Sequence, residues 1–139
     1  MRVAIFHSGA NMSSSLYGQF NWQGDEVTLL PRLANYLLDK RIEGRVFDLI
    51  IISAELKPQP GELPNDFNEL DCSKDVKPAY CLARYLRKDG NPNITTPIIV
   101  ALKNKESAEM YRLLADYERI YFFDESSLSA GAAKSIIGR

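Results

Sequence analysis

The residues of this chain that could do chemistry follow its first apolar run. Residues 4–15 are AIFHSGANMSSS and contain the only histidine, His7. Backbone N–H groups from Gly9 onward, with serine hydroxyls at the start of a helix, could cradle a phosphate. The stretch lacks the GxxxxGK[ST] and GxGxxG spacings, and serines with asparagine also cap helix starts. A small-molecule loop for a nucleotide, flavin or sugar phosphate is therefore one interpretation, and it would use Ser8, Gly9, Asn11, Ser13 and Ser14.

His7 also suggests a second chemistry, in which its imidazole activates a serine. Ser53 closes another apolar run, and an imidazole can take the proton of a hydroxyl nucleophile. His7 and Ser53 are the candidate catalytic residues of such a small hydrolase, with Glu55 or Asp124 as the carboxylate that orients the imidazole. The alternative is a hydrogen-bonded structural histidine at a strand tip. Of the two, the sequence favours a protein that is not an enzyme.

Five apolar runs have the composition of strands that must position these residues. Most of them show no polar alternation, which is typical of strands buried on both faces. Residues 26–30 are weaker and suit an edge strand. The predicted strands cover 3–6, 26–30, 47–52, 97–102 and 120–123.

Between the runs, apolar residues recur at helical spacing, with Pro31 and Pro78 at helix starts and Ser126-Ser127 as a predicted cap. The predicted helices cover 11–20, 30–38, 79–86, 110–117 and 128–137. Strands that alternate with helices predict a three-layer α/β sandwich with a five-stranded parallel sheet, order 2-1-3-4-5, the flavodoxin-like arrangement. Ligands in this fold bind beyond the carboxyl ends of strands one and three, hence near His7 and Ser53.

The composition is that of one ordinary globular domain over residues 1–139. Apolar residues make up 45% and charged residues 25%, with a formal net charge of −1. This charge disfavours a nucleic-acid or membrane surface. No apolar stretch approaches the roughly 18 residues of a membrane span, and the first apolar run is too short for a signal peptide. We therefore expect a cytoplasmic protein in which Cys72 and Cys81 are reduced thiols.

At this point the pattern resembles the receiver domain of bacterial response regulators. The similarity extends over nearly the whole chain, although each matching piece is a common hydrophobic motif. The pieces are Phe47–Ile52, similar to the third receiver strand, Thr96–Val100, similar to the fourth, and Leu113–Phe123, similar to the fourth helix and fifth strand.

The resemblance implies a phosphorylation pocket whose chemical residues are absent here. Receivers hold magnesium on an acidic pair after strand one, accept phosphate on an aspartate ending strand three, and use a hydroxyl after strand four and a lysine after strand five. Magnesium prefers carboxylate oxygens, and a serine cannot form an acyl phosphate. The sequence therefore predicts no metal and no cofactor. The corresponding residues are His7 and Ser8, then Ser53, Leu102 and Asp124.

A long loop insertion at about 54–77 is the second departure from the receiver pattern. It contains several prolines, and its acidic residues outnumber its lysines, so it predicts an acidic flap beside the crevice. The acidic residues are Glu55, Glu62, Asp66, Glu69, Asp71 and Asp75.

The expected function is a non-phosphorylatable signalling or scaffolding module that binds another protein, with a second copy of the chain as one possible partner. By analogy with receivers, the partner surface is helix four, strand five and helix five, and Tyr and Arg are the usual anchors at interfaces. Tyr121 falls where receivers carry an aromatic that swings between buried and exposed positions. Trp22 would suit a contact with a partner, but a single aromatic in a loop usually packs on its own domain, which is the expectation here. Asp48 is expected to be a turn or cap residue rather than a ligand. The predicted partner-binding residues are Tyr111, Arg112 and Tyr121.

Overall fold

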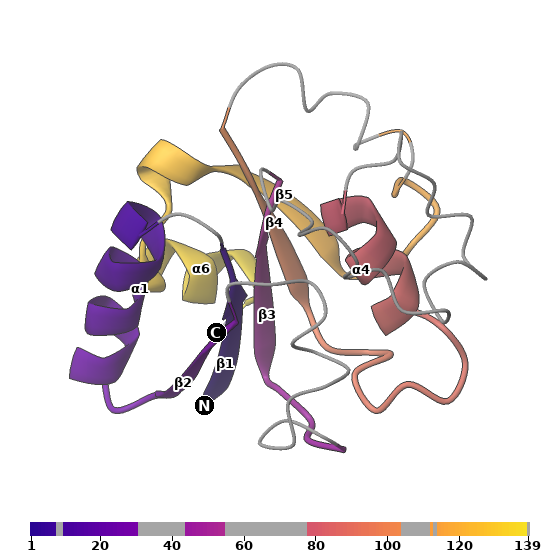
Figure 1. The fold of residues 1–139 in the computed structure, drawn as a ribbon, viewed down its shortest axis with the longest axis horizontal. Coiled ribbons are helices and arrows are strands. Elements are labelled where there is room, and N and C mark those ends of the chain that lie inside the picture. Colours follow the sequence, from indigo (N-terminus) through magenta and orange to yellow (C-terminus); the bar gives the residue numbers. More distant parts are fainter. Residues whose placement is uncertain (8–9, 31–43, 55–77, 104–111, 113, 139) are drawn as a thin grey trace.

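A parallel five-stranded sheet forms the centre of the molecule (Figure 1). The structure is a computed structural model that describes residues 1–7, 10–30, 44–54, 78–103, 112 and 114–138. The sheet order is β2-β1-β3-β4-β5, as predicted, and all pairings are parallel. The strands are β1 (Arg2–Phe6), β2 (Glu26–Leu30), β3 (Leu49–Ser53), β4 (Ile98–Leu102) and β5 (Ile120–Asp124).

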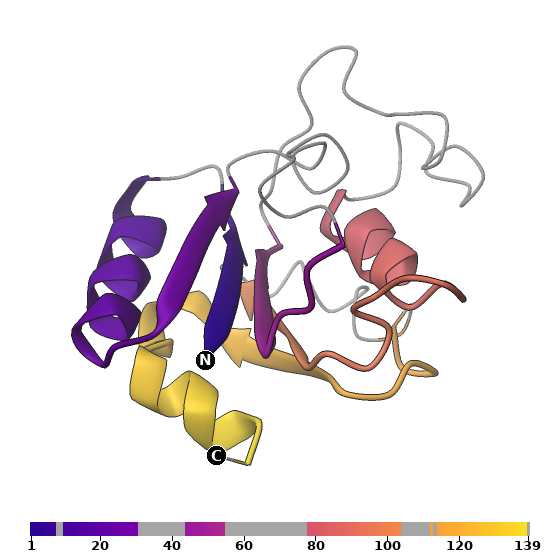
Figure 2. The ribbon, with the colours of Figure 1, turned by 90° about the horizontal axis from the view of Figure 1, so that it is seen from below.

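Helices cover the sheet on both faces (Figures 1 and 2). The helices α1 (Ala10–Trp22) and α6 (Ala130–Ile136) pack on one face, and α4 (Pro78–Leu86) packs on the other. The helices expected at 11–20, 79–86 and near the carboxyl terminus are confirmed. The helix expected over 30–38 lies outside the described residues apart from Leu30, which ends β2. The helix expected over 110–117 is wrong for residues 114–117, which form turns and a bend, whereas Arg112 is helical. No helix within the described ranges is both long and apolar enough to cross a membrane.

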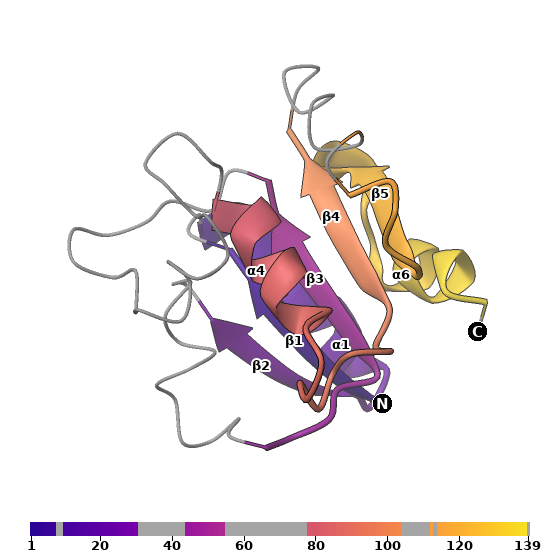
Figure 3. The same cartoon turned by 90° about the vertical axis from the view of Figure 1, so that its right-hand side faces the viewer.

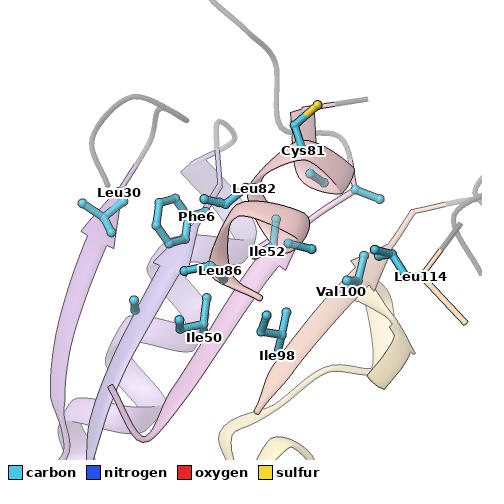
Figure 4. Packing of buried hydrophobic residues seen from close by; sticks show 14 of the residues in the cluster. Phe6, Leu30, Ile50, Ile52, Cys81, Leu82, Leu86, Ile98, Val100 and Leu114 are labelled. Carbon is cyan, nitrogen blue, oxygen red and sulfur yellow. The ribbon is translucent and has the colours of Figure 1, made fainter. Parts of the chain in front are cut away.

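Strand alternation divides the core into two clusters. Alternate side chains of each strand point to opposite faces of the sheet. Those on one face, such as Phe6, Ile52 and Val100, pack beneath α4 (Figure 4). Those on the other face, such as Ile5 and Ile51, pack against α1 and α6. The central strands are therefore buried on both faces, which explains their unbroken apolar sequences. The edge strands β2 and β5 (Figure 3) are only partly buried.

A buried asparagine organises the amino-terminal edge of the sheet. Asn93 is 0% exposed, and its Oδ1 accepts hydrogen bonds from Phe47 N at 2.7 Å and Thr96 Oγ1 at 3.1 Å. Its Nδ2 donates to the carbonyl of Arg45 at 3.0 Å. Each polar atom of this amide therefore has a partner, and together they join the approach to β3 to the approach to β4.

Arg87 fastens the same edge through carbonyl groups. Its guanidinium donates to the carbonyls of Glu118 (3.2 Å), Asn93 (3.1 Å), Thr96 (2.6 Å) and Arg119 (3.2 Å). Desolvation, together with the charge of Arg119, lowers the pKa of Arg87. Arg119 has a φ of 59°, and the bond to its carbonyl helps to hold this left-handed turn before β5.

Asp25 ties α6 to the start of the chain. Its carboxylate, 6% exposed, lies 3.0 Å from the amino group of Met1 and 2.6 Å from Lys134 Nζ. Desolvation raises the pKa of Asp25, but the hydrogen bonds and charges of these two cations outweigh it, so that the pKa lies below 3.8.

Two local sequence predictions are wrong. The cap of the last helix is Ser129, whose Oγ accepts from Ala132 N at 3.0 Å, because Ser126-Ser127 form the 3-10 turn η2 (Glu125–Ser127) instead. Trp22 does not pack on the domain. It ends α1 with 91% of its surface exposed, since the buried stripe of this helix runs through Leu16 and Phe20.

The prediction of reduced cysteines is also wrong for Cys81, which is disulfide-bonded. Cys81 lies on α4, in the cluster beneath that helix. The only other cysteine of the chain, Cys72, falls outside the described residues.

Removing the buried amide should destabilise the fold. Asn93→Ala leaves the Phe47 N–H and the Arg45 carbonyl without their partner, and we expect a loss of about 2–4 kcal/mol in the free energy of unfolding. Urea unfolding followed by circular dichroism measures this loss. The matched control is Asn21→Ala on the exposed face of α1, expected to change stability by less than about 0.5 kcal/mol. Equal effects of the two substitutions would contradict a structural role for Asn93.

The Asp25 ion pairs should make stability depend on pH. Because the folded pKa is depressed, the stabilisation is complete above the unfolded pKa of about 4 and is lost as pH falls through the folded value. We expect Asp25→Asn to cost about 2 kcal/mol at pH 7 and progressively less below pH 4, measured by urea unfolding. Glu26→Gln, which removes only the exposed pairs with Arg2 and Arg45, is the control. A difference from wild type that does not change between pH 7 and pH 2.5 would refute the assignment.

Candidate functional site

The carboxyl edge of the sheet gathers the residues that the sequence singled out. His7 follows β1, and Ser53, Leu102 and Asp124 are the last residues of β3, β4 and β5. From β1 the chain continues into α1 on one face, whereas the helix after β3, α4, lies on the other face. The gap between these strands is the switch point where ligands bind in open α/β sheets. Ser8 lies outside the described residues.

Ser53 and Leu102 offer no reactive group to solvent. Ser53 is 1% exposed and pairs in register with Ala101, whose side chain belongs to the cluster under α1 and α6. Leu102 packs against the cluster under α4. A serine nucleophile must be within reach of its substrate, so the buried hydroxyl of Ser53 argues against the hydrolase interpretation.

The Asp124 side chain caps the 3-10 turn that follows β5. Its Oδ1 accepts from Ser126 Oγ at 2.8 Å and from Ser126 N at 2.9 Å, which caps η2. These hydrogen bonds lower the pKa of the exposed Asp124 carboxyl. The sequence interpretation of Asp124 as a carboxylate that orients His7 is therefore wrong. Glu55, the other candidate, lies outside the described residues.

The neighbouring carboxylate, Glu125, is the one that meets the histidine. His7 Nε2 lies 3.2 Å from Glu125 Oε1, and the side chains are only 9% and 19% exposed. The other oxygen, Oε2, is buried, with no hydrogen-bond partner among the described residues. Sequence reasoning missed Glu125 because it ranked strand-end positions by the receiver pattern. The available signal was its place two residues after Phe123, which faces α1 and α6.

This arrangement does not fit the magnesium site of receivers. A divalent hard cation needs several oxygen ligands, and the described edge turns one carboxylate inward, where it contacts an imidazole. Within the ranges that the structure describes, no group of three or more His, Cys, Asp or Glu residues could hold a metal. The described geometry instead places the imidazole of His7 within hydrogen-bond distance of the Glu125 carboxylate.

The proposed ligand loop is partly a helix. Asn11, Ser13 and Ser14 belong to α1, which begins at Ala10, and Ser14 is exposed. Ser8 and Gly9 lie outside the described residues, so the phosphate-cradle interpretation stays a prediction.

The predicted partner residues differ in their surroundings. Arg112 is exposed, whereas Tyr121 is half-buried against the cluster under α1 and α6. Tyr111 lies outside the described residues, as does the acidic flap apart from Ala54, which is buried.

Comparison with known proteins identifies the architecture. No family model matches the chain, and no curated protein matches its sequence. A two-component response regulator from Clostridium difficile superposes with a TM-score of 0.67 and 16% identity over 100% of this chain and 97% of that one. The receiver domain of a Francisella response regulator gives 0.62 and 14% over 98% and 95%.

The receiver domain of a Pseudomonas aeruginosa sensor histidine kinase, solved with magnesium coordinated in its active-site cleft, gives a TM-score of 0.61 and 15% identity over 99% and 98% of the two chains. All three similarities extend over almost the full length of both chains that are compared. The chain therefore has the fold of response-regulator receiver domains.

Proposed function

We propose that this chain is a receiver-like signalling module that takes no phosphoryl group and acts by binding another protein. The observation that carries the proposal is the His7–Glu125 contact at the carboxyl edge, beside a buried Ser53. Receivers need acidic magnesium ligands and an aspartate acceptor at these positions.

The chemistry of the edge supports the absence of phosphoryl transfer. Ser53 would have to accept the phosphoryl group as an ester, and its hydroxyl is withdrawn from solvent. The inward carboxylate of Glu125 adds negative charge where an incoming phosphoryl group would arrive. Both effects oppose phosphoryl transfer, because burial shields the Ser53 hydroxyl and the Glu125 carboxylate repels the phosphoryl donor.

Magnesium with beryllofluoride should leave this domain unchanged. We expect no saturable shift of the amide NMR signals of His7, Ser53 or Glu125, since the described residues of this edge include no group of acidic ligands for magnesium and Ser53 replaces the aspartate acceptor. The beryllofluoride-activated DrrB receiver domain, to which the chain is similar with a TM-score of 0.60, is the positive control. Saturable shifts around Ser53 would refute the proposal. Nucleotides, flavins and sugar phosphates follow in the same titration, and a saturable shift at the start of α1 would favour the small-molecule alternative.

The partner surface that we propose includes Arg112, Tyr121 and Tyr111. Arg112 is exposed, and β5 is an edge strand with half-buried side chains. Arg and Tyr supply large contact areas and several hydrogen bonds at interfaces. The exposed Trp22 at the end of α1 is the main competing anchor. Residence in a bacterial cytoplasm and pairing with a second copy remain parts of the proposal.

Single substitutions distinguish a partner surface at Arg112 from one at Trp22. We expect Arg112→Ala to weaken capture of the partner by the immobilised domain by about 10-fold, as for an interface anchor worth more than 1 kcal/mol. Quantitative mass spectrometry of proteins retained from a bacterial lysate gives the measurement. Trp22→Ala is the matched control and should retain the same partner. Loss with Trp22→Ala alone would move the interface to α1, and identical retention by both variants would contradict the proposed surface.

A further inference from the structure

The strand β2 forms one end of the sheet (Figures 2 and 3). The carbonyl of Leu30, its last residue, accepts from His7 N at 3.3 Å and so faces β1. In a parallel ladder, the backbone groups of alternate residues face the same neighbour. The N–H and C=O groups of Val27 and Leu29 therefore point away from β1, along the lateral edge of β2. Within the described part of the chain, β1 is the one strand that pairs with β2.

Apolar side chains border this lateral edge on the face that carries α1. Val27 packs at the margin of the cluster beneath α1 and α6, and strand alternation places Leu29 on the same face. Leu29 is 37% exposed, and Tyr17 of α1, a helix that contacts β2, is 41% exposed. A row of outward backbone groups beside exposed apolar side chains suits the addition of a further strand.

The strand β2 contains none of the features that usually block edge pairing. Its sequence, EVTLL, has no lysine, proline or glycine, and its register with β1 runs from end to end without a bulge. Its one charged residue, Glu26, stands at the first position and is paired with Arg2 and Arg45 of the same chain. Charge and backbone irregularity therefore leave the middle of the lateral edge unprotected.

We propose that two copies of this chain pair antiparallel along β2, with Thr28 of one copy opposite Thr28 of the other, and so join their two sheets into one. In this register Val27 lies opposite Leu29 of the second copy, and the outward N–H and C=O groups of both residues gain partners. The same patch serves both copies, as two-fold symmetry requires. This inference deepens the proposed function, because it specifies the surface for the pairing with a second copy that the proposed function includes.

The charge distribution of β2 favours the antiparallel arrangement. Parallel pairing would bring the two Glu26 side chains side by side. Antiparallel pairing about Thr28 separates them by four residue positions, which is about 13 Å along the strand. This exceeds the Debye length of about 10 Å at 0.1 M salt, so that their repulsion is largely screened. Val27 and Leu29 meanwhile form apolar cross-strand pairs, which stabilise a sheet. A second copy thus complements the lateral edge in hydrogen bonding, apolar contact and charge.

Two measurements on the unmodified chain test the pairing. Sedimentation equilibrium should show monomer and dimer at protein concentrations up to about 1 mM, which detects even a weak Kd. Amide hydrogen exchange should slow with rising concentration at Val27 and Leu29, whose N–H groups are covered only in the dimer. The amide of Thr28 already faces β1 and should not change. A monomer at every concentration, or a dimer in which the Val27 and Leu29 amides exchange as in the monomer, would overturn the proposal.

A charge swap at the two-fold axis tests the register. Thr28→Lys places two lysines directly opposite each other, and we expect dimerisation to weaken by about 5-fold, as it should for Thr28→Glu. A mixture of the two variants should associate more tightly than either variant with itself. Ser127→Lys, at an exposed position of η2 after the opposite edge strand, is the matched control and should dimerise like wild type. Equal association of the mixture and the separate variants would overturn the register, and circular dichroism checks that each variant is folded.

Failure of this pairing and failure of the proposed function give different results. The lateral edge of β2 and the strand β5 lie at opposite ends of the sheet. Loss of the dimer in Thr28→Lys should therefore leave the partner capture through Arg112 and the beryllofluoride titration unchanged. A monomeric chain whose Val27 and Leu29 amides become protected only on adding a bacterial lysate would assign the lateral edge to a strand of another protein, and would overturn the pairing of two copies.

Discussion

Burial of the central strands on both faces is the constraint on which the rest of this structure depends. β1, β3 and β4 contribute side chains to both core clusters, and the middle of the sheet has little room for polar chemistry. Polar groups are therefore confined to the two edges where the strands begin and end. The amino-terminal edge uses them for structure, and the carboxyl edge uses them for the candidate site.

The acidic and basic residues at the carboxyl edge stand after the opposite strands from those that the receiver resemblance implies. Receivers have acidic residues after the first strand and a lysine after the fifth. This chain has an imidazole after β1 and a carboxylate after β5, and the two meet at 3.2 Å. The carboxylate in this chain therefore follows β5, whereas the acidic residues of receivers follow the first strand. Within the ranges that the structure describes, this edge presents no cluster of acidic residues to a magnesium ion.

The sequence predicted the sheet well because each central strand is an unbroken apolar run, and only burial on both faces tolerates such runs. It located Ser53, Leu102 and Asp124 at strand ends for the same reason. It missed Glu125 because the cap formed by Asp124 and Ser126 decides which of two adjacent carboxylates turns inward. It missed Asn93 because a buried asparagine in a loop looks like any turn residue until its partners are in place.

The contacts that hold the fold together lie apart from the residues of the candidate site. Asn93 and Arg87 join the loops at the amino-terminal edge, and the clusters beneath the helices hold the layers together. None of these contacts uses the side chain of His7, Ser53 or Asp124. Replacement of the chemical residues at the carboxyl edge therefore leaves the main stabilising contacts intact.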